Sequence, residues 1–302
     1  MARLAALRTI DSAPDALAAL ALLKPITWFP PMWAFACGVV CASFGASISW
    51  WQVALGVALS GPLVCGTSQA VNDWFDREVD ALNEPGRPIP SGRIPGRWGL
   101  YIAIGWTLLS AAAAIPLGTF AIRATLVGLL LAWLYSAPPV RLKRNGWWGN
   151  SAVAVCYEGL PWLTAAAIIG AATPNRHVIL IAALYSLGAH GIMTLNDFKS
   201  IAGDRRMGVG SLPVRLGPER AALLACWTMG AAQVAVITLL VVWGRSAFAL
   251  GVSVLLGVQV LLMRRLLQRP RELAPWYNGT GITLYVLGML LSAFALKSLA
   301  AQ

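Results

Sequence analysis

Acidic side chains are scarce in this chain. Only 12 of its 302 residues are Asp or Glu, charged residues make up 12% and hydrophobic residues 58%. The surface of a water-soluble domain carries about 25–35% charged residues, whereas the mean hydropathy here is +0.68. The shortage of charge excludes a single soluble globule and predicts an all-α, polytopic membrane protein.

Nucleotide-binding and zinc-binding motifs are also missing. No GxGxxG or GKS sequence occurs, so nucleotide chemistry has no support. The cysteines form no CxxC pair and lie in apolar runs, which predicts free thiols rather than a zinc site or a disulfide framework. They are Cys37, Cys41, Cys65, Cys156 and Cys226.

Apolar segments of about 20 residues, the length that spans a bilayer, are plentiful. They predict a bundle of nine transmembrane helices. Several neighbouring segments are joined by only a few residues, while the alternate connections are long. The segments lie near residues 26–48, 51–72, 98–117, 121–138, 149–171, 176–196, 220–243, 246–263 and 276–298.

Basic residues are distributed unevenly over these connections. Of the 23 Lys and Arg residues, 19 fall on one set of alternate connections. Because basic loops favour the cytoplasm, we expect a cytoplasmic N-terminus and a periplasmic C-terminus. Residues 1–23 carry Arg3, Arg8, Asp11 and Asp15 among alanines and leucines, which predicts an amphipathic surface segment. Residues 24–302 then form a single transmembrane domain.

Four of the few acidic residues are concentrated between Asn72 and Asp80. On a helix, Asp73, Asp76 and Asp80 are spaced i, i+3, i+7 and share one face. Carboxylates this close repel one another unless a cation lies between them, and Mg²⁺ prefers oxygen ligands. The spacing therefore predicts a metal site where the second span ends and runs into a loop.

A second acidic segment follows the sixth predicted span. It also opens with an Asn-Asp pair, Asn196 and Asp197, and Asp197 shares a face with Asp204 if the helix continues between them. The segments 72–80 and 196–204 thus form a weak internal pseudo-repeat.

Basic residues surround both acidic segments. Carboxylates together with Lys and Arg suit a Mg²⁺-diphosphate, in which metal ions bridge carboxylates to phosphate oxygens. Ordinary charge decoration beside a membrane is the alternative. The residues are Arg77, Arg87, Arg93, Lys143, Lys199, Arg205 and Arg206.

The pattern Asn-Asp-x-x-Asp-x-x-x-Asp at 72–80 resembles the UbiA superfamily of intramembrane prenyltransferases. The segments GRPIPSG at 86–92, YSAPPVRLK at 135–143 and SLPVRLG at 211–217 agree, and the resemblance covers nearly the whole chain after residue 20. Within the family, AHGIMTLNDFKS at 189–200 is similar to the chlorophyll and bacteriochlorophyll synthase branch.

The resemblance implies a nine-helix bundle whose cavity opens to the cytoplasmic side and to the membrane. An isoprenoid diphosphate would be held by Mg²⁺ between the two motifs. The acceptor would be bacteriochlorophyllide a, esterified at its propionate with a geranylgeranyl or phytyl group in a bacterial inner membrane. Many family members carry further acids in the second motif, where this chain has Ser200 and Ala202.

Site roles follow from that resemblance. Asp73, Asp76 and Asp80 would hold one Mg²⁺ and Asp197 and Asp204 another. Neutral oxygen donors or orienting groups would be Asn72 and Asn196. Diphosphate contacts are expected from Arg87, Lys143, Lys199 and Tyr135, while Arg77 either joins them or pairs with carboxylates on its own helix.

The acceptor would need little activation, because a propionate is already ionised at neutral pH. Glu158, the only acid well inside a predicted span, and His190, one heptad before Asp197, are candidate acceptor contacts. Hydrogen bonding within the bundle is an equal alternative for Glu158 and the preferred one for His190. Other open functions are prenyl transfer to a quinone precursor or haem and, remotely, secondary transport, against which the clustering of acids at one membrane face argues.

Overall fold

The computed structural model describes residues 13–43, 45 and 48–299, so most of the expected amphipathic N-terminal segment lies outside the described residues. Within these ranges the chain is helical throughout, and the one pairing of strand type is an isolated bridge between Asn145 and Gly210. The all-α prediction is confirmed.

The helices follow one another with short connections. At two places a π-helical turn joins consecutive helices without a break: η3 joins α3 to α4, and η6 joins α7 to α8. The α-helices are α1 (Ala16–Leu22), α2 (Phe29–Ala42), α3 (Trp50–Ala58), α4 (Gly66–Asn83), α5 (Trp98–Ala114), α6 (Thr119–Ser136), α7 (Gly146–Ala154), α8 (Leu160–Gly170), α9 (Arg176–Asn196), α10 (Ile201–Arg206), α11 (Leu212–Leu216), α12 (Pro218–Val242), α13 (Ser246–Gln268) and α14 (Pro270–Leu299). The π turns are η3 (Leu59–Cys65) and η6 (Val155–Gly159), and the 3₁₀ turns are η2 (Pro25–Thr27), η4 (Ile115–Leu117), η5 (Leu142–Arg144) and η7 (Asp197–Ser200).

The helices form a polytopic membrane bundle. By length and hydropathy, 8 of the described helices can cross a membrane, or 9 if the pair 16–27 and 29–42, bent by 58°, counts as one span. The first span is thus not the straight helix expected over 26–48. Pro25 and the Pro30-Pro31 pair explain the bend, because proline cannot donate the hydrogen bond that continues a helix.

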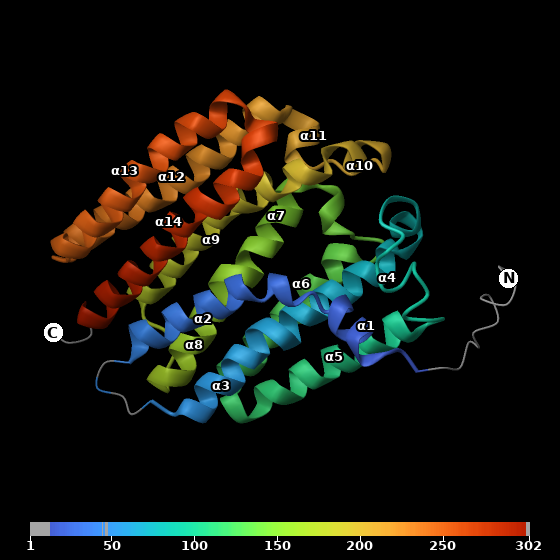
Figure 1. The fold of residues 1–302 in the computed structure, drawn as a ribbon. Coiled ribbons are helices and arrows are strands. Elements are labelled where there is room, and N and C mark those ends of the chain that lie inside the picture. The colour runs from blue at the N-terminus through green and yellow to red at the C-terminus, as the bar shows by residue number, and fades with distance from the viewer. Residues whose placement is uncertain (1–12, 44, 46–47, 300–302) are drawn as a thin grey trace, which may run out of the picture.

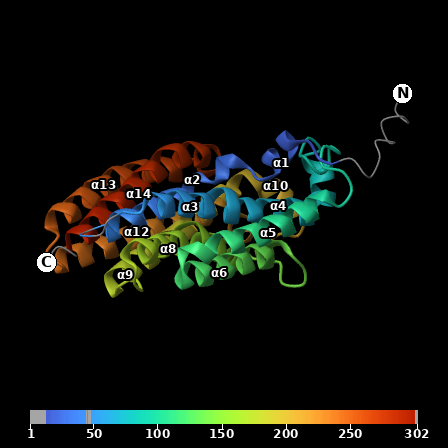
Figure 2. The same ribbon diagram turned by 90° about the horizontal axis from the view of Figure 1, so that it is seen from below.

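The helix arrangement is shown in Figures 1 and 2. In Figure 1 α12, α13 and α14 lie together on one side of the bundle and α3, α4 and α5 on the other. One hydrophobic core joins α2, α8 and α9 to α12–α14, and a smaller one joins α1 to α4 and α5. We call the end of the bundle that holds α1, α10 and the C-terminal end of α4 the motif end; α14 ends at the opposite end (Figure 1).

The two acidic segments begin differently and end differently. The first is helical throughout, as its spacing predicted, but α4 continues to Asn83, so the loop starts at Glu84 rather than at Ala81. Residues 72–83 contain no Gly or Pro to end the helix, and Pro85 is the first such residue. The second does not continue as a regular helix, since the 3₁₀ turn η7 separates α9 from α10.

Candidate functional site

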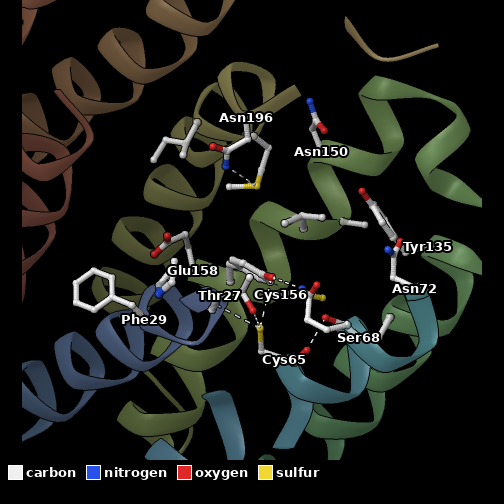
Figure 3. A pocket seen from close by; sticks show the side chains of 18 of the residues that line it. Thr27, Phe29, Cys65, Ser68, Asn72, Tyr135, Asn150, Cys156, Glu158 and Asn196 are labelled. Carbon is white, nitrogen blue, oxygen red and sulfur yellow. Dashed lines mark hydrogen bonds between the residues drawn. The ribbon is translucent and has the colours of Figure 1, made fainter. Parts of the chain in front are cut away.

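A cavity of about 670 Å³ opens between the two halves of the bundle. Its walls come from α4, α6, α7 with η6, α9, α14 and the start of α2 (Figure 3). Six of the residues predicted to form the site line this cavity. They are Asn72, Tyr135, Glu158, Asn196, Asp197 and Lys199.

Arg87 joins two of the predicted carboxylates. It donates to Asp80 at 2.8 Å and to Asp73 at 3.4 Å, and it also pairs with Glu84. Burial acts to lower the pKa of Arg87, but the Glu84 hydrogen bond and the nearby carboxylates outweigh it and raise that pKa. Lys24 reaches the same place from the bend after α1 and donates to Asp73 at 2.6 Å.

Asp76 faces a different pair of cations. It accepts hydrogen bonds from Lys143 at 2.5 Å and from Arg141 at 2.9 Å. Lys143 also donates to the Oδ1 atom of Asn72 at 3.1 Å. Burial lowers the pKa of Lys143, and the charge of Asp76 works against that shift.

The loop that carries these two cations is anchored to the second half of the chain. Asn145 caps α7 by accepting from the backbone N–H of Trp147 at 3.0 Å. The backbone N–H of Gly146 donates to Gly210, and that of Gly210 donates to Arg144, both at 2.9 Å. These bonds hold the loop before α7 against the loop after α10, so basic residues near the first motif and the second motif meet at the motif end.

The second motif is held mainly by neutral side chains. Asn150 of α7 donates to Asp197 at 3.2 Å, and Asn278 of α14 donates to Asn196 at 2.8 Å. Ser200 donates to Asp204 at 2.8 Å. The second motif is therefore positioned by amide and hydroxyl donors rather than by ion pairs.

In the described part of the chain, Arg77 and His190 neither line the cavity nor pair with an aspartate of the two motifs. The guanidinium of Arg77 stacks 4.3 Å from the centre of the Trp74 ring and pairs with Glu78, which fits the alternative of a role on its own helix. His190 is buried and stacks on Trp147, with ring centres 5.7 Å apart, rather than pointing into the cavity.

Four polar residues at the site were not foreseen from the sequence. Lys24 and Arg141 contact carboxylates of the first motif, while Asn150 and Asn278 contact the second. Lys24 precedes a proline, and Asn150 and Asn278 lie near the ends of predicted spans. A polar side chain at the edge of an apolar segment was therefore the only sequence feature that could have pointed to these residues.

The donor set suits a hard divalent cation, although the carboxylates here face cationic side chains. Among the described residues, no group of three or more His, Cys, Asp or Glu side chains is gathered as a ready metal site. However, the Oδ2 atom of Asp73 is buried without a hydrogen-bond partner. This free oxygen, the oxygens of Asp76 and Asp80, and the Asn72 amide are ligands that Mg²⁺ prefers, so the residues present fit the ion.

Comparison with known proteins agrees with this geometry. The model of the UbiA prenyltransferase family matches residues 28–279. The chain belongs to the UbiA prenyltransferase family. It is therefore a membrane-embedded prenyltransferase.

Individual UbiA family members are also similar. The chain is 58% identical to the bacteriochlorophyll synthase 33 kDa chain of Cereibacter sphaeroides, over 95% of each chain. It is 53% identical to the protein of the same name from Rhodobacter capsulatus, again over 95% of each. Among solved structures, a UbiA homolog from Archaeoglobus fulgidus bound to GPP and Mg²⁺ has a TM-score of 0.67 at 22% identity, covering 93% of this chain and 99% of that chain. That likeness shows the fold.

Proposed function

We propose that this enzyme esterifies the propionate of bacteriochlorophyllide a with a geranylgeranyl or phytyl group taken from the isoprenoid diphosphate. The proposed acceptor rests on the 58% identity, over 95% of both chains, to a bacteriochlorophyll synthase chain. The step would complete bacteriochlorophyll synthesis, because it joins the finished ring to its tail.

The two motifs would hold Mg²⁺ and the diphosphate together. Asp73, Asp76, Asp80 and Asn72 would hold one ion, and Asp197, Asp204 and Asn196 would hold another. Mg²⁺ bound there would neutralise negative charge on the diphosphate and so make it a better leaving group. The A. fulgidus homolog bound to GPP and Mg²⁺ supports Mg²⁺ and an isoprenoid diphosphate as ligands of this fold.

Basic residues at the motif end would bind the rest of the diphosphate charge. We assign direct contacts to Arg87, Lys143 and Lys199, and a hydrogen bond to Tyr135. Lys143 already donates to Asn72 and Asp76, and Lys199 and Tyr135 line the cavity. Donors that bind the departing diphosphate more tightly than the bound substrate lower the barrier to ionisation.

Lys24 and Arg141 would hold the carboxylates of the first motif in position. Each contacts a carboxylate of α4 and neither lines the cavity. The apolar wall formed by Val64, Leu131 and Ile192 would keep water away from the allylic cation. The acceptor carboxylate, ionised at neutral pH, would then attack without a general base.

We place the enzyme in a bacterial inner membrane with a cytoplasmic N-terminus and a periplasmic C-terminus. The support is the excess of Lys and Arg in the connections at the motif end. In this orientation the diphosphate would enter from the cytoplasm and the prenyl chain from the bilayer.

The test is a membrane assay. Membranes containing the enzyme are mixed with geranylgeranyl or phytyl diphosphate and bacteriochlorophyllide a, with and without EDTA. We expect esterified pigment that disappears when the chelator is present. Absence of ester, combined with prenylation of a quinone precursor or haem in the same membranes, would refute the proposed acceptor.

A further inference from the structure

Glu158 is a buried acid with an unused hydrogen-bonding group. Its residue is 5% exposed, and its Oε2 atom is buried without a hydrogen-bond partner. It nevertheless lines the cavity. Burying a polar group without a partner costs stability, so an unpartnered carboxyl on a cavity wall indicates a ligand that supplies the missing contact.

The local backbone directs this residue into the cavity. Pro161 has no N–H to donate to the carbonyl of Tyr157, which favours the wider π turn η6 at Val155–Gly159. The other side of the turn is closely packed, because a Cβ atom on Gly159 would lie 2.6 Å from the Ser186 hydroxyl. The neighbour Tyr157 lines the same cavity.

Tyr157 adds a hydrogen-bond donor beside Glu158. Its hydroxyl oxygen accepts from the Gln69 amide at 3.2 Å, and the Cys65 thiol lies 3.4 Å away. While its oxygen accepts from Gln69, the hydroxyl still has its own proton to donate to a ligand. Tyr157 and Glu158 therefore form a polar patch, which we call the 157–158 subsite.

Glu158 lies apart from the diphosphate-binding wall. Figure 3 shows Glu158 close to Phe29 and across the cavity from Asn72 and Tyr135. Apolar side chains, including Ile282 and Val286, also line the cavity. A molecule whose reacting group lies at the motif end must therefore be large to reach Glu158 as well.

The chemistry of the subsite favours a neutral polar group. A charge that is buried without a counter-ion is costly, and among the described residues Glu158 has no ion pair. The carboxyl of Glu158 is therefore protonated in this subsite, and its O–H can donate a hydrogen bond. A ring carbonyl can accept hydrogen bonds from such a subsite, whereas a vinyl group cannot. Bacteriochlorophyllide a carries an acetyl group where chlorophyllide a carries a vinyl group.

We propose that Glu158 and Tyr157 hydrogen-bond a carbonyl substituent on the rim of the planar acceptor and so select acceptors that carry one. This inference rests on the proposed function. A site built around a hydrogen bond discriminates strongly against an analogue that lacks the group, and for one neutral hydrogen bond we expect a preference of about tenfold.

The test uses two chlorophyllides that differ only in an acetyl or a vinyl group at one ring position. The ratio of kcat/KM for the two acceptors is measured in the full-length enzyme and in Glu158→Leu, Glu158→Gln and Tyr157→Phe. We expect Glu158→Leu to lose the preference, Glu158→Gln to keep most of it because the amide still donates, and Tyr157→Phe to reduce it. KM for the prenyl diphosphate should not change.

Ser211→Ala is the matched control, because its hydroxyl is also buried without a partner but does not line the cavity. It should leave the preference unchanged. Full preference in both Glu158→Leu and Tyr157→Phe would overturn the subsite while the proposed function stands. If Glu158→Leu does not accumulate, the nearly isosteric Tyr157→Phe decides alone. Wild-type enzyme that esterifies neither pigment would remove the proposed function itself, and the subsite with it.

Discussion

Asp76 is bound by its own pair of cations. Its carboxylate accepts from Lys143 and Arg141, whereas Asp73 and Asp80 share Arg87 and Asp73 also accepts from Lys24. If Asp76 binds a metal ion beside the diphosphate, Asp76→Ala should lower kcat/KM by roughly 100-fold or more, the range for loss of one group that stabilises developing charge. The measurement is esterification in membranes at saturating Mg²⁺.

Glu272→Gln supplies the control for that substitution. Glu272 is an exposed acid on α14 that pairs with Arg269, so its change should leave activity unaltered. Protein amount and thermal unfolding in detergent check that Asp76→Ala remains folded and inserted. Near-normal turnover by a folded Asp76→Ala enzyme would rule out the metal-binding role.

Lys143 should make activity sensitive to alkaline pH. Burial lowers its pKa, so its amine loses the proton at a lower pH than an exposed lysine does. If the charged amine binds diphosphate, kcat/KM should fall as pH rises through that lowered pKa. Lys143→Arg keeps its charge to higher pH and should move the fall upward.

The pH profile of kcat/KM distinguishes this effect from general alkaline inactivation. Lys297→Arg, near the end of α14 and far from the motif end, is the control and should retain the wild-type profile. Identical profiles for wild type and Lys143→Arg would argue against a charged Lys143 at the diphosphate.

Spacing rules identified the carboxylates but not their partners. Asp73, Asp76 and Asp80 are close in sequence, so helical periodicity was enough to group them. Lys24 lies 49 positions before Asp73 in the chain. Such a contact depends on how α1 packs against α4, which local patterns do not encode.

At the level of elements, hydropathy located the spans better than their ends. The predicted second span stopped where polar residues began, yet α4 continues to Asn83 because those polar residues are compatible with a helix. The first span was misjudged for the opposite reason, since apolar residues continue across prolines that bend the chain. The π turns η3 and η6 had no clear sequence signal beyond Pro62 and Pro161.

The bend after α1 should couple Mg²⁺ binding to stability. Lys24 contacts Asp73, which is 1% exposed, and Arg87 offers a second, longer contact. Lys24→Met should therefore destabilise the protein by about 1–3 kcal/mol, less than loss of a sole partner would. A divalent cation would replace the missing charge, so Mg²⁺ should raise the Tm of Lys24→Met more than that of wild type.

Thermal unfolding in detergent with EDTA or with millimolar MgCl₂ measures this difference. Arg245→Met, at the end away from the motifs, provides a control in which a cation is lost without contact to the acidic segments. Equal Mg²⁺-dependent shifts in Lys24→Met and wild type would show that the ion does not bind at Asp73.

On the scale of the whole molecule, the membrane class followed from composition, and the lengths of the apolar segments predicted nine spans where the described residues have 8 or 9. The cavity followed from neither. The hydrogen bond from Gly146 to Gly210 and the hydrogen bond from Asn278 to Asn196 join segments that are distant in sequence. They place α7 and α14 at one cavity with α4 and α9. Sequence patterns identified both motifs. Only the packed structure showed that ion pairs hold the first motif and that amide donors hold the second motif.

The same packing leads to a prediction about topology. Ser91 follows α4 at the motif end, whereas Ser246 starts α13 at the other end, and both are exposed. If the basic connections are cytoplasmic, a membrane-impermeant maleimide should label Ser91→Cys only in inside-out vesicles and Ser246→Cys only in right-side-out vesicles. The native thiols Cys37 and Cys226 are buried and should label in neither preparation. Reversed labelling would place the motif end in the periplasm, away from a cytoplasmic supply of prenyl diphosphate, and would contradict the proposed orientation while leaving the fold unchanged.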